Sequence, residues 1–189
     1  MKCLLEKLSK KQLLIGSLIS TTCYFIASYF LDILYLKSKF SVPYFEAQTS
    51  FDAKKIKVWY QELIDFGTID TYYQTQYFDF LFIATVIAMG YFVWFLFGSM
   101  LSKNTMLYKN KYQLSIFLPL AGLFDILENL VSFIMLASPT SFNDNLVYLY
   151  SGFASLKFLC WSIAIIILII LIIAVIYNLL FSKRKFKNI

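Results

Sequence analysis

Polar side chains share one face of the third apolar segment of the chain. They are spaced at intervals of three, one and three residues: Asp125, Glu128, Asn129 and Ser132. Residues at this spacing lie on the same side of a helix. Two carboxyl groups beside an amide could bind a polar ligand, move a proton or act as acid and base. The same residues could instead form a structural network that fixes the register of the helices, and both interpretations stay open.

A single cation, Lys157, interrupts the fourth apolar segment. At a helical rise of 1.5 Å per residue, Lys157 lies about 12 Å below the outer boundary, and Glu128 lies about 13 Å below it. The two segments are joined by a short turn and should be antiparallel neighbours. An unpaired charge at this depth costs at least a few kcal/mol. The sequence therefore predicts an ion pair between Lys157 and either Glu128 or Asp125.

Other polar residues are expected close to this pair. Asp79 stands near the outer end of the second apolar segment, and Trp161 follows Lys157 by one helical turn. Asp32, at the outer end of the first segment, is interpreted as an interface residue only. Because three acids face one Lys, at least one carboxyl group should be protonated, shared or solvated by water. The predicted polar cluster contains Asp79, Asp125, Glu128, Asn129, Ser132, Lys157 and Trp161.

Four apolar segments are long enough to hold these residues inside a membrane. The chain has 189 residues, of which 60% are hydrophobic, and its mean hydropathy is +0.69. A helix needs about 20 apolar residues to cross the hydrocarbon core. The expected spans are residues 13–36, 77–101, 114–137 and 149–181. We therefore predict an all-α integral membrane four-helix bundle, formed as a single domain from residues 1–189.

The distribution of basic residues predicts the orientation of the spans. The N-terminal segment, the loop between spans two and three, and the tail at 182–189 hold eleven Lys and Arg but one acid, Glu6. The loop at 37–76 holds five Lys and five acids. Cytoplasmic flanks collect Lys and Arg. Both termini are therefore predicted to be cytoplasmic, with a bacterial inner membrane favoured.

The outer loop at 37–76 carries the pattern of a short amphipathic helix. Asp52 can cap a helix that begins at Ala53, and Gly67 can end it. Ile56, Tyr60 and other apolar residues recur on one face. This helix is expected to lie on the membrane surface or on the ends of the spans. A lid that shields the bundle is the favoured interpretation, and a docking surface for a partner is the alternative.

Several classes of chemistry lack their usual residues. The chain has no His, and its 3 Cys form no CxxC pair, so no metal site is predicted. The 6 Gly are not clustered into a phosphate or dinucleotide loop, and no cofactor is expected. Basic residues do not alternate with exposed aromatic residues, which argues against nucleic-acid binding.

The segment Phe124-Asp125-Ile126-Leu127-Glu128-Asn129 forms a fairly specific motif, FD-x-x-EN. Together with Asp79 and Lys157, it resembles a family of uncharacterised bacterial four-span membrane proteins with an FD-x-x-EN signature on span three and a Lys on span four. Members often have Trp directly after that Lys, where this chain has Phe158. The resemblance covers spans two to four. It implies the fold and a shared polar centre, but no activity.

Three kinds of function fit these features. The favoured one is an accessory, scaffold or subunit protein of a membrane assembly, whose partners are the lipid bilayer and other membrane subunits. The alternative is a protein that binds a lipid or other apolar ligand, or an enzyme that uses Asp125 and Glu128 as acid and base, with a pocket of several hundred Å³. A proton or ion carrier is disfavoured, because residues 163–176 contain no polar side chain.

Overall fold

The computed structural model describes residues 8–182, with side chains through residue 180, and this part of the chain contains helices but no strand. The helices are α1 (Lys10–Ser38), α2 (Tyr44–Gln48), α3 (Ala53–Asp65), α4 (Ile69–Gly98), α5 (Met106–Lys109), α6 (Lys111–Leu114), α7 (Phe117–Leu136) and α8 (Asn145–Ser182). Four helical segments are long and apolar enough to cross a membrane: α1, α4, α6 with α7, and α8. The predicted all-α four-helix bundle is confirmed.

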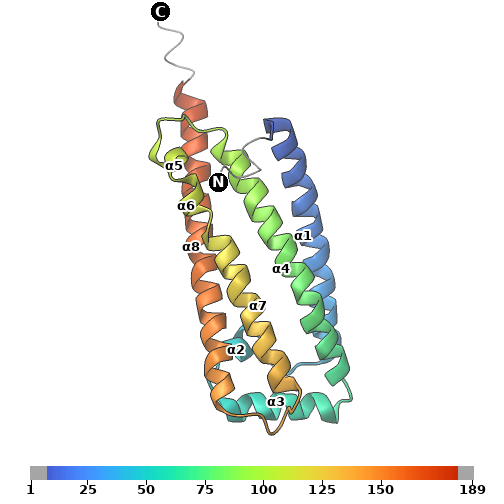
Figure 1. Ribbon diagram of the computed structural model, residues 1–189. Helices are drawn as coiled ribbons and strands as arrows, with labels where there is room; N and C mark the ends of the chain where they lie inside the picture. The colour runs from blue at the N-terminus through green and yellow to red at the C-terminus, as the bar shows by residue number, and fades with distance from the viewer. Residues whose placement is uncertain (1–7, 183–189) are drawn as a thin grey trace, which may run out of the picture.

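The bundle consists of two helical hairpins. α1 packs along α4, α8 packs along α7, and the two hairpins meet where α4 contacts α7. α1 begins and α8 ends at the same end of the bundle, where α5 and α6 also lie, whereas α2, α3 and the turn between α7 and α8 lie at the opposite end (Figure 1). The end with α2 and α3 is called the α3 end below.

Several helix boundaries differ by a few residues from those expected, and two of the differences have a clear physical reason. α4 begins at Ile69, eight residues before the expected start of span two, because the polar stretch before Tyr77 is also helical. Tyr72 and Thr75 within it are buried, so tertiary packing extends the helix beyond the membrane-spanning part. α7 begins at Phe117, which places Pro119 in its first turn. Proline costs little stability there, because the backbone N–H that it lacks would have no hydrogen-bond partner within the helix.

The amphipathic helix predicted in the outer loop is α3, which lies across the ends of the long helices (Figure 1). Asp52 caps it by accepting hydrogen bonds from the backbone N–H groups of Lys54 and Lys55. It ends before Gly67, whose φ of +66° is a conformation that glycine adopts without strain. The predicted lid is confirmed as a structural arrangement.

Helix α3 is held on the ends of the long helices by burial of its apolar face and by an ion pair. Ile56, Tyr60 and Leu63 pack against α4, α7 and α8 in one apolar core. Burial raises the pKa of the Tyr60 hydroxyl above its ordinary value, because the phenolate would lose its water. On the surface, Lys57 Nζ lies 2.5 Å from Asp144 Oδ1 in the α7–α8 turn.

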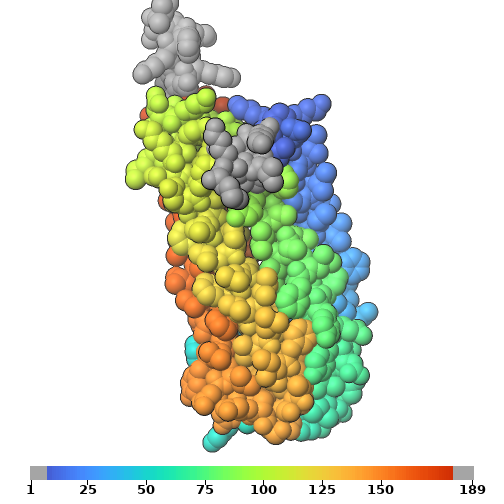
Figure 2. Space-filling model, viewed as in Figure 1, coloured from blue at the N-terminus to red at the C-terminus, as the bar shows by residue number. Residues whose placement is uncertain are grey.

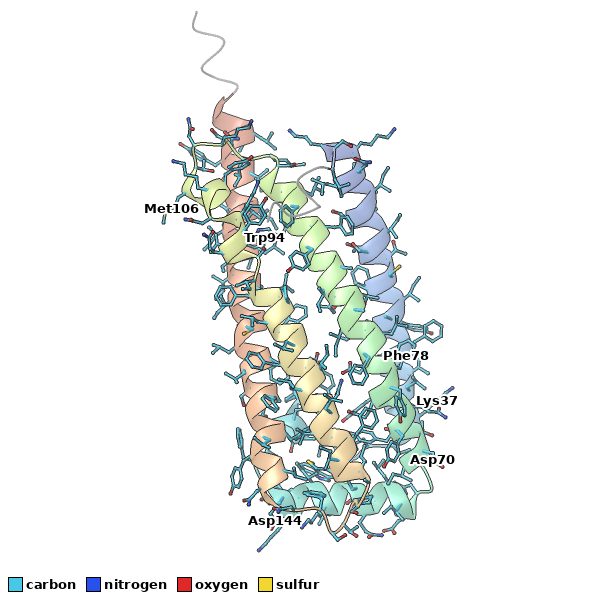
Figure 3. The ribbon with its side chains drawn as sticks, viewed as in Figure 1. Lys37, Asp70, Phe78, Trp94, Met106 and Asp144 are labelled. Carbon is cyan, nitrogen blue, oxygen red and sulfur yellow. The ribbon has the colours of Figure 1, made fainter. Side chains whose placement is uncertain are left out.

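A second apolar core lies at the other end of the bundle. It contains Leu13, Trp94, Phe95, Leu96, Leu101, Leu171 and Val175. Figure 3 shows Trp94 toward this end, whereas Lys37, Asp70 and Asp144 lie toward the α3 end. The polar cluster of α7 therefore lies between two apolar cores.

Close approach of α4 and α7 brings the polar residues of the two helices together. A Cβ atom added at Gly122 of α7 would lie 2.5 Å from Ile87 Cδ1 and 3.3 Å from Ile83 Cγ2 on α4. Glycine has no Cβ atom, so at this position it lets the side chains of the neighbouring helix approach closely. Side chains of α4 and α7 meet along the face of the molecule shown in Figure 2.

Candidate functional site

Lys157 forms ion pairs with both acids that were proposed as its partners. Its Nζ donates to Glu128 Oε2 at 2.5 Å and to Asp125 Oδ1 at 3.0 Å. The three residues are buried, with exposed fractions of 5% for Lys157, 1% for Glu128 and 7% for Asp125. The predicted pairing between spans three and four is therefore confirmed, and one ammonium is shared by two carboxyl groups.

Burial and distance together determine what this ion group contributes. Removing three charged groups from water is costly, and their attraction offsets that cost only when the geometry is close and each group is hydrogen-bonded. Both carboxyl groups lie within hydrogen-bonding distance of the ammonium. The face of the Phe158 ring also lies 4.9 Å from Lys157 Nζ. The group is thus internally compensated, and loss of any one member would leave a charge exposed to an apolar interior.

Asp79 is hydrogen-bonded to Asn129, whereas Asp125 and Glu128 are paired with Lys157. Asn129 Nδ2 donates to Asp79 Oδ2 at 2.6 Å, which joins α7 to α4. Asn129 is 1% exposed, so this bond lies inside the protein. Ser132, one turn further along α7, is fully buried beside the hydroxyl group of Tyr60. Asp79 and Asn129 were both expected in the cluster, but their pairing was not foreseen.

A cavity of about 440 Å³ lies beside the ion group. Four members of the predicted polar cluster line it: Asp79, Asp125, Lys157 and Trp161. The other three, Glu128, Asn129 and Ser132, do not line it; they lie behind the wall, where Glu128 contacts Lys157 and Asn129 contacts Asp79. The cluster therefore divides into a part that faces the cavity and a part that supports it.

The cavity lining becomes less polar along the bundle. The cavity extends about 22 Å along α8, from Tyr150 to Ile165. Near the α3 end its wall includes Gln48 of α2 and Gln76 of α4. Toward the middle of the bundle Phe82, Trp161 and Ile165 line it, with Ser162 as a polar residue among them. A molecule with a polar end and an apolar end would match this gradient.

The cavity is bordered by two helices that do not pack together. α1 contributes Tyr24, Ser28 and Asp32 to its wall, and α8 contributes Lys157 and its neighbours. Yet α1 packs along α4 and α8 along α7, with no extended packing of α1 on α8. The cavity is therefore lined on two sides by helices that are not joined by extended packing.

Sequence reasoning did not include Asp32, Gln48 or Gln76 in the polar cluster, although all three line the cavity. Asp32, expected to be an interface residue only, lines the cavity from α1 and forms no hydrogen bond or ion pair with another described residue. Gln48 and Gln76 also line it, and their Oε1 atoms are buried without a hydrogen-bond partner among the described residues. The available signal was the polar stripe on span one, where Ser28 and Asp32 are four residues apart.

Among residues 8–182, no group of three or more His, Cys, Asp or Glu side chains is arranged to hold a metal ion. Comparison with known protein families, with curated proteins and with solved structures gives no match. The function proposed below is therefore inferred from the geometry of the cavity and of its wall.

Proposed function

We propose that this chain is a membrane protein that binds an amphipathic molecule, which enters from the bilayer between α1 and α8. The observation that carries the proposal is the cavity of about 440 Å³ with Asp79, Asp125 and Lys157 in its wall. Ligand sites in proteins commonly have volumes of 300–1,000 Å³ and few polar groups. The volume corresponds to about 15 water-sized groups. It suits a head group and part of one chain, with the remainder between α1 and α8.

Two other functions were considered for the same residues. An accessory or scaffold role is the second candidate, because Glu128, Asn129 and Ser132 are fully buried and well suited to fixing helix register. A purely structural network would not need a cavity beside it, however. An enzyme that uses Asp125 and Glu128 as acid and base is less well supported, because Glu128 does not line the cavity. The resemblance to bacterial four-span proteins remains a prediction.

Filling the cavity should remove the bound molecule. Ser28→Trp places a large ring in the cavity wall on α1, whereas Ile26→Trp places the same ring on the lipid-facing side of that helix, where Ile26 is 53% exposed. Native mass spectrometry of protein extracted from membranes should show one retained amphiphile in the wild type and in Ile26→Trp, but not in Ser28→Trp. Retention by Ser28→Trp, or no retained molecule in the wild type, would contradict the proposal.

We also propose that both termini are cytoplasmic and that the α3 end faces outward, in a bacterial inner membrane. The basic flanks support this orientation, and the position of α5 and α6 at the end where α1 begins is consistent with it.

The orientation can be tested with single cysteines in a chain whose own Cys are replaced by Ser. A membrane-impermeant maleimide added to intact cells should label Thr140→Cys in the α7–α8 turn, because Thr140 is exposed at the α3 end. Lys103→Cys, in the exposed loop after α4, should react only after the membrane is permeabilised. The opposite labelling pattern would reverse the orientation.

A further inference from the structure

We propose that the head group bound in this cavity is a cation, an ammonium group that bears N–H donors and is carried by an alkyl chain. This inference rests on the proposed function and specifies its ligand. It follows from three independent features of the cavity wall: its charge, the kind of polar atom that lacks a partner, and its aromatic rings.

The first feature is an excess of acid. Asp32, Asp79 and Asp125 line the cavity, and Lys157 is the sole Lys or Arg of the described residues that does so. Lys157 is already engaged by Asp125 and by Glu128 behind the wall. An anionic head group would therefore meet acids without a free cation, and burying like charges together is unfavourable. A cationic head group would compensate the excess.

The second feature is a set of acceptors that need donors. The exposed fraction of Gln76 is 9%, and its Oε1 atom has no hydrogen-bond partner among the described residues. Gln48 Oε1 is buried without a partner in the same way. A buried acceptor without a donor is unfavourable. An ammonium group supplies N–H donors, whereas a fully ionised phosphate or sulfate ester supplies acceptors only.

The third feature is the density of aromatic rings around the acids. Rings in the wall include Tyr24, Tyr44, Phe82, Phe158 and Trp161. Cations bind over the faces of such rings, and quaternary ammonium groups are recognised by aromatic cages. Lys157 Nζ already lies 4.9 Å from the centre of the Phe158 ring, so one ring of this wall holds a cation.

The three features are arranged along a single axis. Gln76 precedes Asp79 by three residues on α4, so the two lie one turn apart on the same face. Phe82 follows Asp79 by another three residues. A head group beside Asp79 would thus have the side chain of Gln76 on one side. Its chain would lie on the other side, among Phe82, Trp161 and Ile165.

Amphiphiles that share the same chain length but differ in head group separate the effect of head-group charge from that of the chain. Purified full-length protein in neutral maltoside micelles would be titrated with dodecylammonium, lauroyl glycerol and dodecyl phosphate. Tryptophan fluorescence would report binding, with Trp161→Phe as the blank. The cationic probe should bind about tenfold more tightly than the neutral one, and the anionic probe should bind least.

Three isosteric variants test the assignment of residues. Asp32→Asn and Asp79→Asn should each reduce the preference for the cationic probe by about tenfold. Asp32 has no described partner to lose, and an amide at position 79 can still accept from Asn129, so both variants should fold. Asp70→Asn is the matched control, because Asp70 is an exposed acid on α4 that does not line the cavity. It should leave the preference unchanged.

The outcomes distinguish this inference from the proposed function. Equal binding of the cationic and neutral probes, or tightest binding of dodecyl phosphate, would show that the head group is not a cation. The proposed function, binding of an amphipathic molecule, would still stand. Absence of binding by all three probes overturns the proposed function itself. Methylammonium, which has the head group without a chain, should bind much more weakly. If it bound as tightly as dodecylammonium, the cationic head group would stand and the requirement for an apolar chain would fall.

Discussion

Replacing Lys157 with Met is expected to lower the free energy of unfolding by about 3–5 kcal/mol. The substitution preserves most of the side-chain volume but removes the ammonium that lies 2.5 Å from Glu128 and 3.0 Å from Asp125. Two carboxyl groups would then face each other at exposed fractions of 1% and 7%. They would have to give up their charge or draw in water. Unfolding by sodium dodecyl sulfate in mixed micelles, followed by far-UV circular dichroism, would measure the loss.

Lys57→Met is the matched control for this experiment. Its ion pair with Asp144 has the same 2.5 Å distance, but the side chains are 26% and 66% exposed. Exposed pairs contribute about 0–1 kcal/mol, so burial and the second carboxyl group paired with Lys157 distinguish the two substitutions. A cost for Lys157→Met no greater than that for Lys57→Met would show that the buried ion group does not hold the bundle together.

A charge-free version of the ion group provides the complementary result. Combining Lys157→Met with Asp125→Asn and Glu128→Gln removes the ammonium and both carboxyl groups from the interior. Stability should then recover toward that of the wild type, because a buried ion pair is costly mainly when it is broken on one side. Failure to recover would mean that packing, rather than uncompensated charge, explains the loss in the single variant.

The ion group was predictable from the sequence because two simple constraints determine it. A short turn between two apolar segments makes them antiparallel neighbours, and the rise per residue then places Lys157 and Glu128 at equal depth. Hydrocarbon solvates charge poorly, so the pair had to form. The capped helix at Ala53 was predictable for a similarly local reason, since Asp52 has backbone N–H groups to cap.

The cavity was not predictable, because it depends on how the hairpins sit against each other. α1 and α4 are apolar around most of their circumference, so hydropathy does not indicate which side faces the bundle. The direction of Asp32 depends on the rotation of α1, and the pairing of Asp79 with Asn129 depends on the approach of α4 to α7 at Gly122. Such rotations are set by packing between helices distant in sequence. Equal depth alone could not distinguish Asn129 from Lys157 as the partner of Asp79.

Asn129→Leu is expected to lower the free energy of unfolding by about 1–2 kcal/mol. Hydrogen bonds to charged groups contribute about 1.5–3 kcal/mol, but side-chain bonds inside membranes average about 0.6 kcal/mol and reach about 1.7. The bond to Asp79 lies near the upper end of the membrane range, because it is 2.6 Å long and Asn129 is 1% exposed. The cost is limited because Asp79 also faces the cavity, where other polar groups can reach it. Unfolding in mixed micelles would again measure it.

Asn178→Leu makes the same chemical change at another bond between elements. Asn178 Nδ2 donates to the neutral backbone oxygen of Met100 at 3.2 Å, and its side chain is only partly buried. Its loss should cost less than that of Asn129, about 0.5 kcal/mol. A double-mutant cycle with Asp79→Leu should recover most of the Asn129 effect as coupling, because the two residues share one bond. Equal costs for the two Asn variants, with no coupling to Asp79, would show that this bond does not join the hairpins. The position of Asp79 in the cavity wall would then need another explanation.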